Sequence, residues 1–274
     1  MITLKEMITK KDMKQFVLFP FSIYKNNPYW VPPIISEELE VLDKDKNPAF
    51  ENAEARFFVA IKNGEIVGRI AAIINWYEVK EQHIKKMRFG WYDVIDDLEV
   101  SKKLIEAVIE FGKERKLSFI EGPVGFSNMD KAGLLTHGFN ELSTMITWYH
   151  NPYQKEHLEK LKMKKLAEWV EYRIQIFDEQ KAPKKVKRFS DIIMKRYNLH
   201  QLNFKKTNEI EPYFDEMFEL LNQTYNTLQT FVPIQQYQVD HYKKRYLRYI
   251  HPDFIKSVAD KDGKLVAFAI TMPS

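Results

Sequence analysis

The sequence predicts an α/β protein with a mixed sheet flanked by helices, and two patterns indicate this fold class. A β-hairpin is predicted where residues 57–61 and 66–74, both apolar, flank Asn63-Gly64, because Asn-Gly supplies the positive φ angles of a tight turn. The second of these segments is almost wholly apolar, which is typical of a central strand buried on both faces. Residues 100–113 then place apolar side chains at helical spacing.

The other elements are predicted in chain order from periodicity and capping signals. Helices are expected over residues 11–27, 34–42, 191–197, 210–225 and 239–250, the first interrupted at Pro20. Strands are expected over residues 87–95, 117–120, 145–149 and 169–177, and a second hairpin over 254–259 and 265–271. Asn151-Pro152, with Gln154 three residues after the cap, has the pattern of a capped helix that ends near Met163.

Composition narrows the classes of protein. The chain has 274 residues, a net charge of +4 and no cysteine, which excludes disulfides, thiolate nucleophiles and Cys-based zinc sites. No apolar run approaches the roughly 20 residues of a membrane helix, and residues 1–14 have no signal-peptide core. We therefore expect a cytoplasmic protein without a membrane partner, and the near-balance of charges argues against nucleic acid.

An internal repeat is predicted from matched segments. Val59-Ala60 matches Val258-Ala259 at an offset of 199, and Trp30-Val31-Pro32 matches Phe231-Val232-Pro233 at an offset of 201. The sequence thus predicts a first domain over residues 1–178, a linker over 179–189, and the start of a second copy over 190–274. By analogy with the first copy, we expect the second to lack roughly 100 residues after its hairpin.

The order of elements resembles that of GNAT-type N-acyltransferases. The stretch FFVAIKNGEIVGRIAAII resembles the second and third strands of that fold. FGWYDVIDDLEVSKKLIEAVIEFGKERKLSFIEGPV resembles its fourth strand, cofactor-side helix and fifth strand, and YHNPYQKEHLEKLKMKK resembles its late helix. The resemblance covers residues 11–177 and restarts near Ile210. It is greatest to large, uncharacterised bacterial members built from two fused halves.

The resemblance implies acetyl-coenzyme A as cofactor, but the cofactor signature is absent. Family members hold the pyrophosphate with a Gly-rich loop, Arg/Gln-x-x-Gly-x-Gly/Ala, at a helix N-terminus. Here the same position reads Asp96-Asp97-Leu98-Glu99-Val100-Ser101, with three acids and no glycine. We expect these carboxylates to repel a pyrophosphate, so the cofactor-binding residues are unknown and are expected beyond Ser274 in the second copy.

Candidate site residues follow from these positions. The resemblance implies that Tyr153, in the late helix, is the general acid toward the leaving thiolate, while a packed surface aromatic is the structural alternative. Asp96 and Glu121 are candidate general bases, although acids at a helix start more often serve as caps. Gly122, Ser127, Asn128 and Tyr149 are candidate substrate-binding residues, because loops at the carboxyl ends of strands place ligands. A turn that needs glycine is the alternative reading of that loop.

Other chemistries lack their motifs. The seven histidines form no His-x-x-x-His pair and no carboxylate cluster completes a ligand set, so no metal is predicted. Basic runs at residues 160–165, 184–188 and 243–245 could contact nucleic acid beside Tyr242 and Tyr246, but solvated helix faces are the simpler interpretation. Two hypotheses stay open for function: an acyl-coenzyme A-dependent N-acyltransferase acting on a small-molecule or peptide amine, and a non-catalytic scaffold of the same fold.

Overall fold

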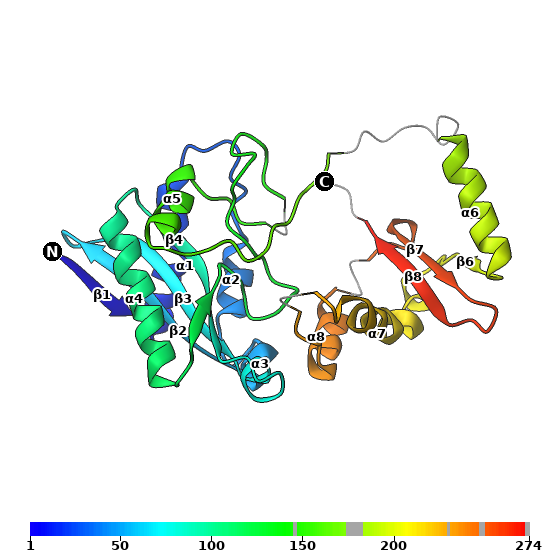
Figure 1. Ribbon diagram of the computed structural model, residues 1–274, viewed down its shortest axis with the longest axis horizontal. Helices are drawn as coiled ribbons and strands as arrows, with labels where there is room; N and C mark the ends of the chain where they lie inside the picture. Colours follow the sequence, from blue (N-terminus) through cyan, green and yellow to red (C-terminus); the bar gives the residue numbers. More distant parts are fainter. Residues whose placement is uncertain (145–146, 174–182, 229–230, 247–249, 272–274) are drawn as a thin grey trace. The chain divides into compact units, whose positions relative to one another are not determined.

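A computed structural model describes residues 1–144, 147–173, 183–228, 231–246 and 250–271. The chain divides into two compact units, unit 1 (Met1–Trp169) and unit 2 (Val170–Ser274). Each unit has its own sheet (Figure 1). Each also has its own clusters of buried apolar side chains.

Unit 1 contains a five-stranded mixed sheet. Its strands lie in the order β1-β2-β3-β4-β5, with bounds β1 (Ile2–Glu6), β2 (Ala53–Lys62), β3 (Glu65–Asn75), β4 (Lys86–Val94) and β5 (Phe119–Glu121). The first four strands are antiparallel and β5 runs parallel to β4. The β2–β3 turn has positive φ angles at Asn63 and Gly64, so the predicted hairpin is confirmed.

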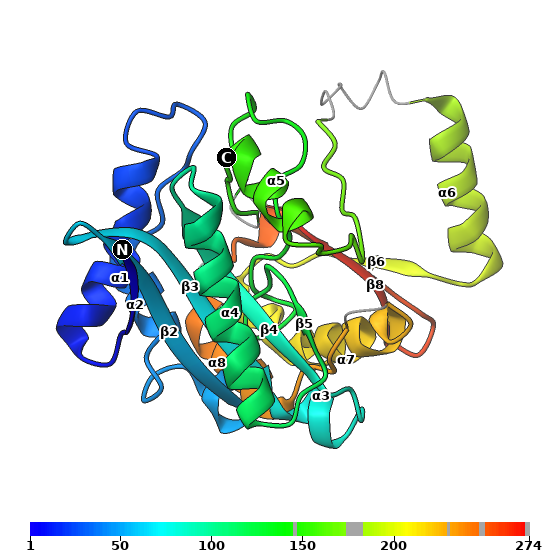
Figure 2. The ribbon, with the colours of Figure 1, turned by 60° about the vertical axis from the view of Figure 1, so that its left-hand side comes forward.

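Helices cover both faces of this sheet, as predicted for the fold class. They are α1 (Lys10–Ile23), α2 (Ile35–Val41), α3 (Trp76–Lys80), α4 (Leu98–Glu114) and α5 (Pro152–Lys160), with a 3-10 turn η1 (Pro48–Glu51). Figure 2 shows α4 lying across one face, where Leu104 and Val108 pack in the cluster that contains Ile70. On the other face, Phe16 of α1 packs in a second cluster with Ile73.

The three residues of β5 pair with the first three residues of β4, and the chain after β5 continues along β4. A β-bulge shifts the β3–β4 register, and Trp91 beside it has a φ of 47°. The N–H of Val124 then donates to the carbonyl of Phe89 at 2.7 Å. A Cβ on Gly122 would lie 2.3 Å from the Phe89 oxygen, and one on Gly90 2.6 Å from the Val124 oxygen. Both positions therefore need glycine, because the two backbones approach so closely.

Unit 2 has a three-stranded antiparallel sheet. Its strands are β6 (His200–Leu202), β7 (Ile255–Ala259) and β8 (Leu265–Ile270), in the order β6-β7-β8. Its helices are α6 (Lys184–Arg196), α7 (Phe214–Tyr225) and α8 (Gln236–Tyr246), with 3-10 turns at Thr207–Glu209, Glu211–Tyr213 and Pro252–Phe254. One apolar cluster joins Met217 of α7 to Ile255 and Leu265 of the sheet.

The structure differs from several of the sequence-based expectations. Residues 169–173 and 147–149 form no strand, and the rest of those two predicted strands lies outside the described residues. Residues 184–189, expected in a linker, belong to α6, so the helix expected over 191–197 begins at Lys184. The short strands β1 and β6 were not predicted, because short, mostly exposed strands carry little alternation in apolar residues.

Candidate functional site

The N-terminus of α4, where the resemblance places a cofactor pyrophosphate, is capped by the protein's own carboxylate. Asp97 Oδ1 accepts the N–H of Glu99 at 3.0 Å, and its Oδ2 accepts Lys62 Nζ at 2.8 Å. The hydrogen bond from Lys62 is the main cause that lowers the pKa of Asp97. Asp97 is therefore negatively charged at neutral pH, and its carboxylate occupies the position at the helix N-terminus where an anion would bind. The residues at this position do not fit a pyrophosphate.

Asp96, beside that cap, is hydrogen-bonded to a buried imidazole. Its Oδ1 lies 3.1 Å from Nε2 of His157, whose Nδ1 lies 2.8 Å from Oγ of Ser101. The hydroxyl of Tyr92 donates to the same Oγ at 2.7 Å. Because Ser101 is fully buried, this Asp–His–Ser arrangement does not expose a nucleophile. The Asp96 side chain is 71% exposed, so the row of hydrogen bonds links the buried Tyr92 to solvent.

The two predicted tyrosines have their hydroxyl groups engaged. Tyr153 donates to the carbonyl of Val94 at 2.8 Å and accepts from Asn151 Nδ2 at 3.1 Å. Burial raises the pKa of Tyr153, which makes its proton harder to release. Tyr149 donates to the carbonyl of Phe139 at 2.9 Å. In this conformation neither hydroxyl is free to meet a substrate.

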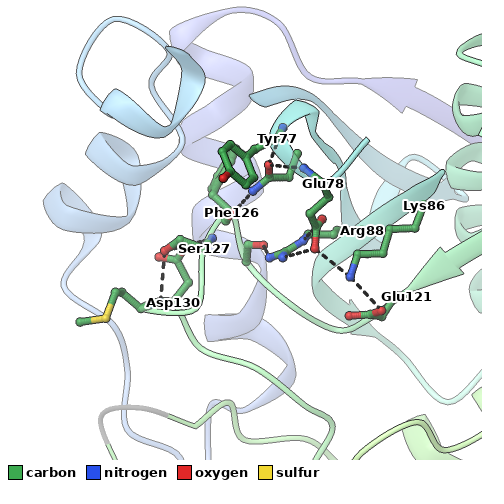
Figure 3. A network of polar contacts seen from close by, with 11 residues as sticks. Tyr77, Glu78, Lys86, Arg88, Glu121, Phe126, Ser127 and Asp130 are labelled. Carbon is green, nitrogen blue, oxygen red and sulfur yellow. Dashed lines mark hydrogen bonds and ion pairs between the residues drawn. The ribbon is translucent and has the colours of Figure 1, made fainter. Parts of the chain in front are cut away.

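Glu121 belongs to a buried ionic network at the start of β4 (Figure 3). Arg88 donates to both oxygens of Glu78, at 2.8 and 2.7 Å. Lys86 Nζ lies 2.8 Å from Glu78 and 3.1 Å from Oε2 of Glu121. The Oε1 of Glu121 is buried without a hydrogen-bond partner among the described residues. Burial opposes ionisation of Glu78, but Arg88 and Lys86 together lower its pKa.

The loop after β5 is folded on Asp130. Asp130 Oδ2 accepts the N–H of Ser127 at 2.8 Å and its hydroxyl at 3.3 Å. Burial raises the pKa of Asp130. A Cβ on Gly125 would lie 2.3 Å from Cβ of Asp130, so the loop also needs glycine here. Asn128 is exposed, which leaves it the most accessible of the predicted substrate-binding residues.

A third polar cluster was missed by the sequence analysis. Arg69 of β3 and Asp93 of β4 form a buried ion pair, with Nε and Nη2 each 2.7 Å from Oδ2. The hydroxyl of Tyr24 donates to Oδ1 of Asp93 at 2.8 Å, and Arg69 also donates to the carbonyl of Phe16 at 2.9 Å. A single arginine inside an apolar strand, next to a strand that contains an aspartate, is the signal that could have revealed this pair.

His150 lies buried near this ion pair. Burial is the main cause that lowers its pKa to about 4, with Arg69 adding to the effect and Asp93 opposing it. The N–H of Leu135 donates to Nδ1 of His150 at 3.2 Å, so the neutral ring carries its hydrogen on Nε2. Lys131, from the same loop, has its pKa lowered mainly by burial. These perturbed groups gather on the face of β4 that α1 and α2 cover.

Of the predicted catalytic residues, Asp96 and Tyr153 both contact His157, but Glu121 lies apart from them. Glu121 is the β5 residue paired in register with Arg88, near the start of β4. Tyr153 donates a hydrogen bond to the carbonyl of Val94, at the end of β4. Six residues of strand separate these positions, which corresponds to about 20 Å. Within the described residues, no group of three or more His, Asp or Glu side chains could hold a metal ion. In that same part of the chain, every helix is too short or too polar to cross a membrane.

Comparison with known proteins gives two curated relatives, and no protein-family model matches. The chain is 28% identical over 267 residues to Protein YghO of Escherichia coli (strain K12), covering 97% of this chain and 67% of that protein. It is 29% identical over 147 residues to the bacterial ceramide synthase of Caulobacter vibrioides (strain NA1000 / CB15N), covering 53% of this chain and 38% of that protein.

Several solved structures similar to the chain are described as acetyltransferases, and one is described as a transcriptional regulator from Bacillus halodurans C-125. One is a predicted acetyltransferase with acetyl-CoA from Clostridium acetobutylicum, with 12% identity, a TM-score of 0.40, and coverage of 63% of this chain and 96% of that one. Another is an acetyltransferase of the GNAT family from Staphylococcus aureus Mu50, with 20% identity, a TM-score of 0.31, and coverage of 44% and 72%. The predicted resemblance to GNAT-type acyltransferases is therefore confirmed as a resemblance. These TM-scores are below 0.5, so the fold class of unit 1 is assigned from its own strand order and strand directions.

Proposed function

We propose that this chain is part of an acyl-coenzyme A-dependent N-acyltransferase made of two GNAT-type units, and that unit 1 does not hold the coenzyme. The statement that unit 1 does not hold the coenzyme is supported by the N-terminus of α4, which Asp97 already caps. Asp97 takes a backbone N–H that would otherwise meet a phosphate, and Lys62 neutralises Asp97 instead of a ligand. A coenzyme bound to this protein is therefore expected on the other unit.

The paired strands of unit 2 support the idea of a second copy. Apart from α6, the elements of unit 2 follow the order strand, helix, helix, strand, strand. The elements of unit 1 from β1 to β3 follow the same order. The matched residues Ala60 and Ala259 each pair with a short preceding strand, at Leu4 and His200 respectively. Both hairpins also carry a register shift within one residue of these alanines.

Matched aromatic residues give independent support. Tyr24 packs on Trp30 with ring centroids 5.3 Å apart. Tyr225 and Phe231, which match Tyr24 and Trp30 at the same offset of 201, are also in contact, with ring centroids 6.2 Å apart. Two unrelated segments would have no reason to repeat the same pair at the same place between two helices. The second unit is thus best interpreted as the beginning of another copy of the fold.

Under this proposal the catalytic roles expected of Tyr153, Glu121 and Asp96 pass to the matching positions of the second copy. In unit 1 these side chains stabilise structure: Tyr153 binds Val94, Glu121 neutralises Lys86, and Asp96 holds His157. The loop with Gly122, Ser127 and Asn128 is retained as a proposed acceptor-side surface, whereas the buried Tyr149, whose hydroxyl binds the carbonyl of Phe139, is not.

The acceptor is proposed to be an amine, and one relative suggests its class. A ceramide is the amide of a long-chain amino alcohol, so the name of the Caulobacter relative agrees with transfer of an acyl group to an amine. The non-catalytic alternative is also favoured by a specific observation, the closed start of α4. If the second copy lacks a cofactor loop as well, the protein is a scaffold.

A thiol-release assay separates these functions. The 274-residue chain contains no cysteine, so with this chain a thiol reagent reports only coenzyme A set free by acyl transfer, and for a longer version a reaction without amine gives the background. We would assay this chain, and a version that continues past Ser274 into a whole second unit, with acetyl- and long-chain acyl-coenzyme A and a panel of amines. The proposal expects release from the longer version alone. Release by the 274-residue chain would contradict the closed cofactor site, and no release from either would support the scaffold.

A further inference from the structure

Helix α6 is amphipathic and its apolar side chains are exposed. None of its residues is buried, and Val186, Phe189, Ile192 and Ile193 are between 47% and 62% exposed. Tyr197, which follows the last turn, is 60% exposed. A helix in a globular domain ordinarily buries such a face, so this one lacks a partner among the described residues.

These side chains form a continuous stripe. Val186, Phe189, Ile193 and Tyr197 stand at intervals of three and four residues, which places them on one side of the helix. Ile192 lies beside Phe189 on the same side, whereas Asp191 points to the opposite side. We call the set Val186, Phe189, Ile192, Ile193 and Tyr197 the α6 stripe.

The rest of α6 is strongly basic. Its charged residues are six bases and one acid, Lys184, Lys185, Lys187, Arg188, Lys195, Arg196 and Asp191, for a net charge of 6 − 1 = +5. None of the six bases makes an ion pair with a carboxylate among the described residues. The partner of this helix must therefore accept an apolar stripe and a high density of positive charge together.

Three kinds of partner can be compared on that requirement. A nucleic acid would neutralise the bases but leave the stripe in water. A second copy of α6 would cover the stripe but bring a charge of +5 against +5, which is repulsive. An anionic lipid surface satisfies both features, because its phosphates attract the bases while the apolar side chains enter the acyl-chain boundary.

We propose that α6 binds the surface of a membrane rich in anionic phospholipid, lying in its plane with the α6 stripe turned toward the acyl chains. This inference does not depend on the proposed acyltransferase activity. It revises the expectation of no membrane partner, which considered only spanning segments. Lys185 and Arg196, at the two ends of the stripe, can extend their long side chains to the headgroups.

A single labelled cysteine tests the orientation directly, because the natural chain has none. We would label the Ile192→Cys and Asp191→Cys variants with an environment-sensitive fluorophore and add vesicles of phosphatidylcholine alone, or with about one third phosphatidylglycerol. The Ile192→Cys emission should shift to the blue with the anionic vesicles only. The Asp191→Cys emission should stay unchanged, although loss of that acid makes α6 more basic and cannot weaken binding.

Charge variants test the electrostatic part by vesicle flotation. Lys187→Gln/Arg188→Gln should weaken partitioning about 30-fold, because each base near an anionic surface contributes to binding. The matched control, Lys10→Gln/Lys11→Gln on the exposed start of α1, should change it less than about threefold. Equal binding to neutral vesicles, equal loss in both variants, or an Ile192→Cys emission already blue without vesicles would overturn the proposal. The last result would place the stripe against protein.

Discussion

A single buried histidine ties the stability of unit 1 to pH. Burial lowers the pKa of His150 to about 4 from its ordinary 6.5, so its stabilising contribution is complete above pH 6.5 and is lost as pH falls toward 4. Between about pH 7.5 and about pH 5 the free energy of unfolding should drop by about 2 kcal/mol. Urea unfolding at the two pH values measures this drop. His150→Gln should reduce it, and His137→Gln, exposed in the same loop, should not.

The Arg69–Asp93 pair is the other residue-scale test. Both side chains are buried, at 5% and 7% exposed, so Arg69→Met would leave an unpaired carboxylate inside the protein at a cost of about 3–5 kcal/mol. The double variant Arg69→Met/Asp93→Leu should unfold at a higher urea concentration than Arg69→Met alone. If the two substitutions were simply additive, the pair would not be the coupled unit that the 2.7 Å contacts indicate.

At the scale of elements, the cap of α4 can be separated from its charge. Asp97→Ala removes the side-chain acceptor of the Glu99 N–H and should lower the free energy of unfolding by about 1 kcal/mol. Asp97→Asn keeps an acceptor while it loses the ion pair with Lys62, so it should cost less. Chemical unfolding of both variants measures the difference. A loss as large for Asn as for Ala would mean that Lys62, and not capping, gives Asp97 its structural role.

Helices and strands were predictable from the sequence where local turn, capping or periodic signals were strong. Contacts between these elements were not predictable in the same way. The hairpin with Asn63-Gly64 and the capped helix after Asn151 form as expected, because local turn and capping chemistry determines them. The strand predicted over residues 169–177 is absent from residues 169–173, and its remaining residues lie outside the described part of the chain. Arg69 in its apolar strand was a signal for a buried ion pair, but the sequence alone did not fix Asp93 as its partner, because the β-bulge near Trp91 sets which β3 and β4 side chains meet.

At the scale of the whole molecule, unit 1 should fold by itself. It contains two apolar clusters, one on each face of its sheet, both made of its own residues. Residues 1–169 expressed alone should therefore unfold in one cooperative urea transition with native-like circular dichroism. A chain that stays unfolded, or melts without cooperativity, would mean that unit 1 depends on unit 2 for its core.

We propose that the start of α4 in unit 1 does not receive a cofactor pyrophosphate, because Asp97 caps it. Calorimetric titration of the 274-residue chain with acetyl-coenzyme A tests it most directly. We predict no saturable heat up to about 1 mM ligand, and the same for Glu106→Gln/Glu110→Gln, which removes two exposed acids from the middle of α4. Saturable binding in the micromolar range, weakened by substitutions at the start of α4, would contradict the claim.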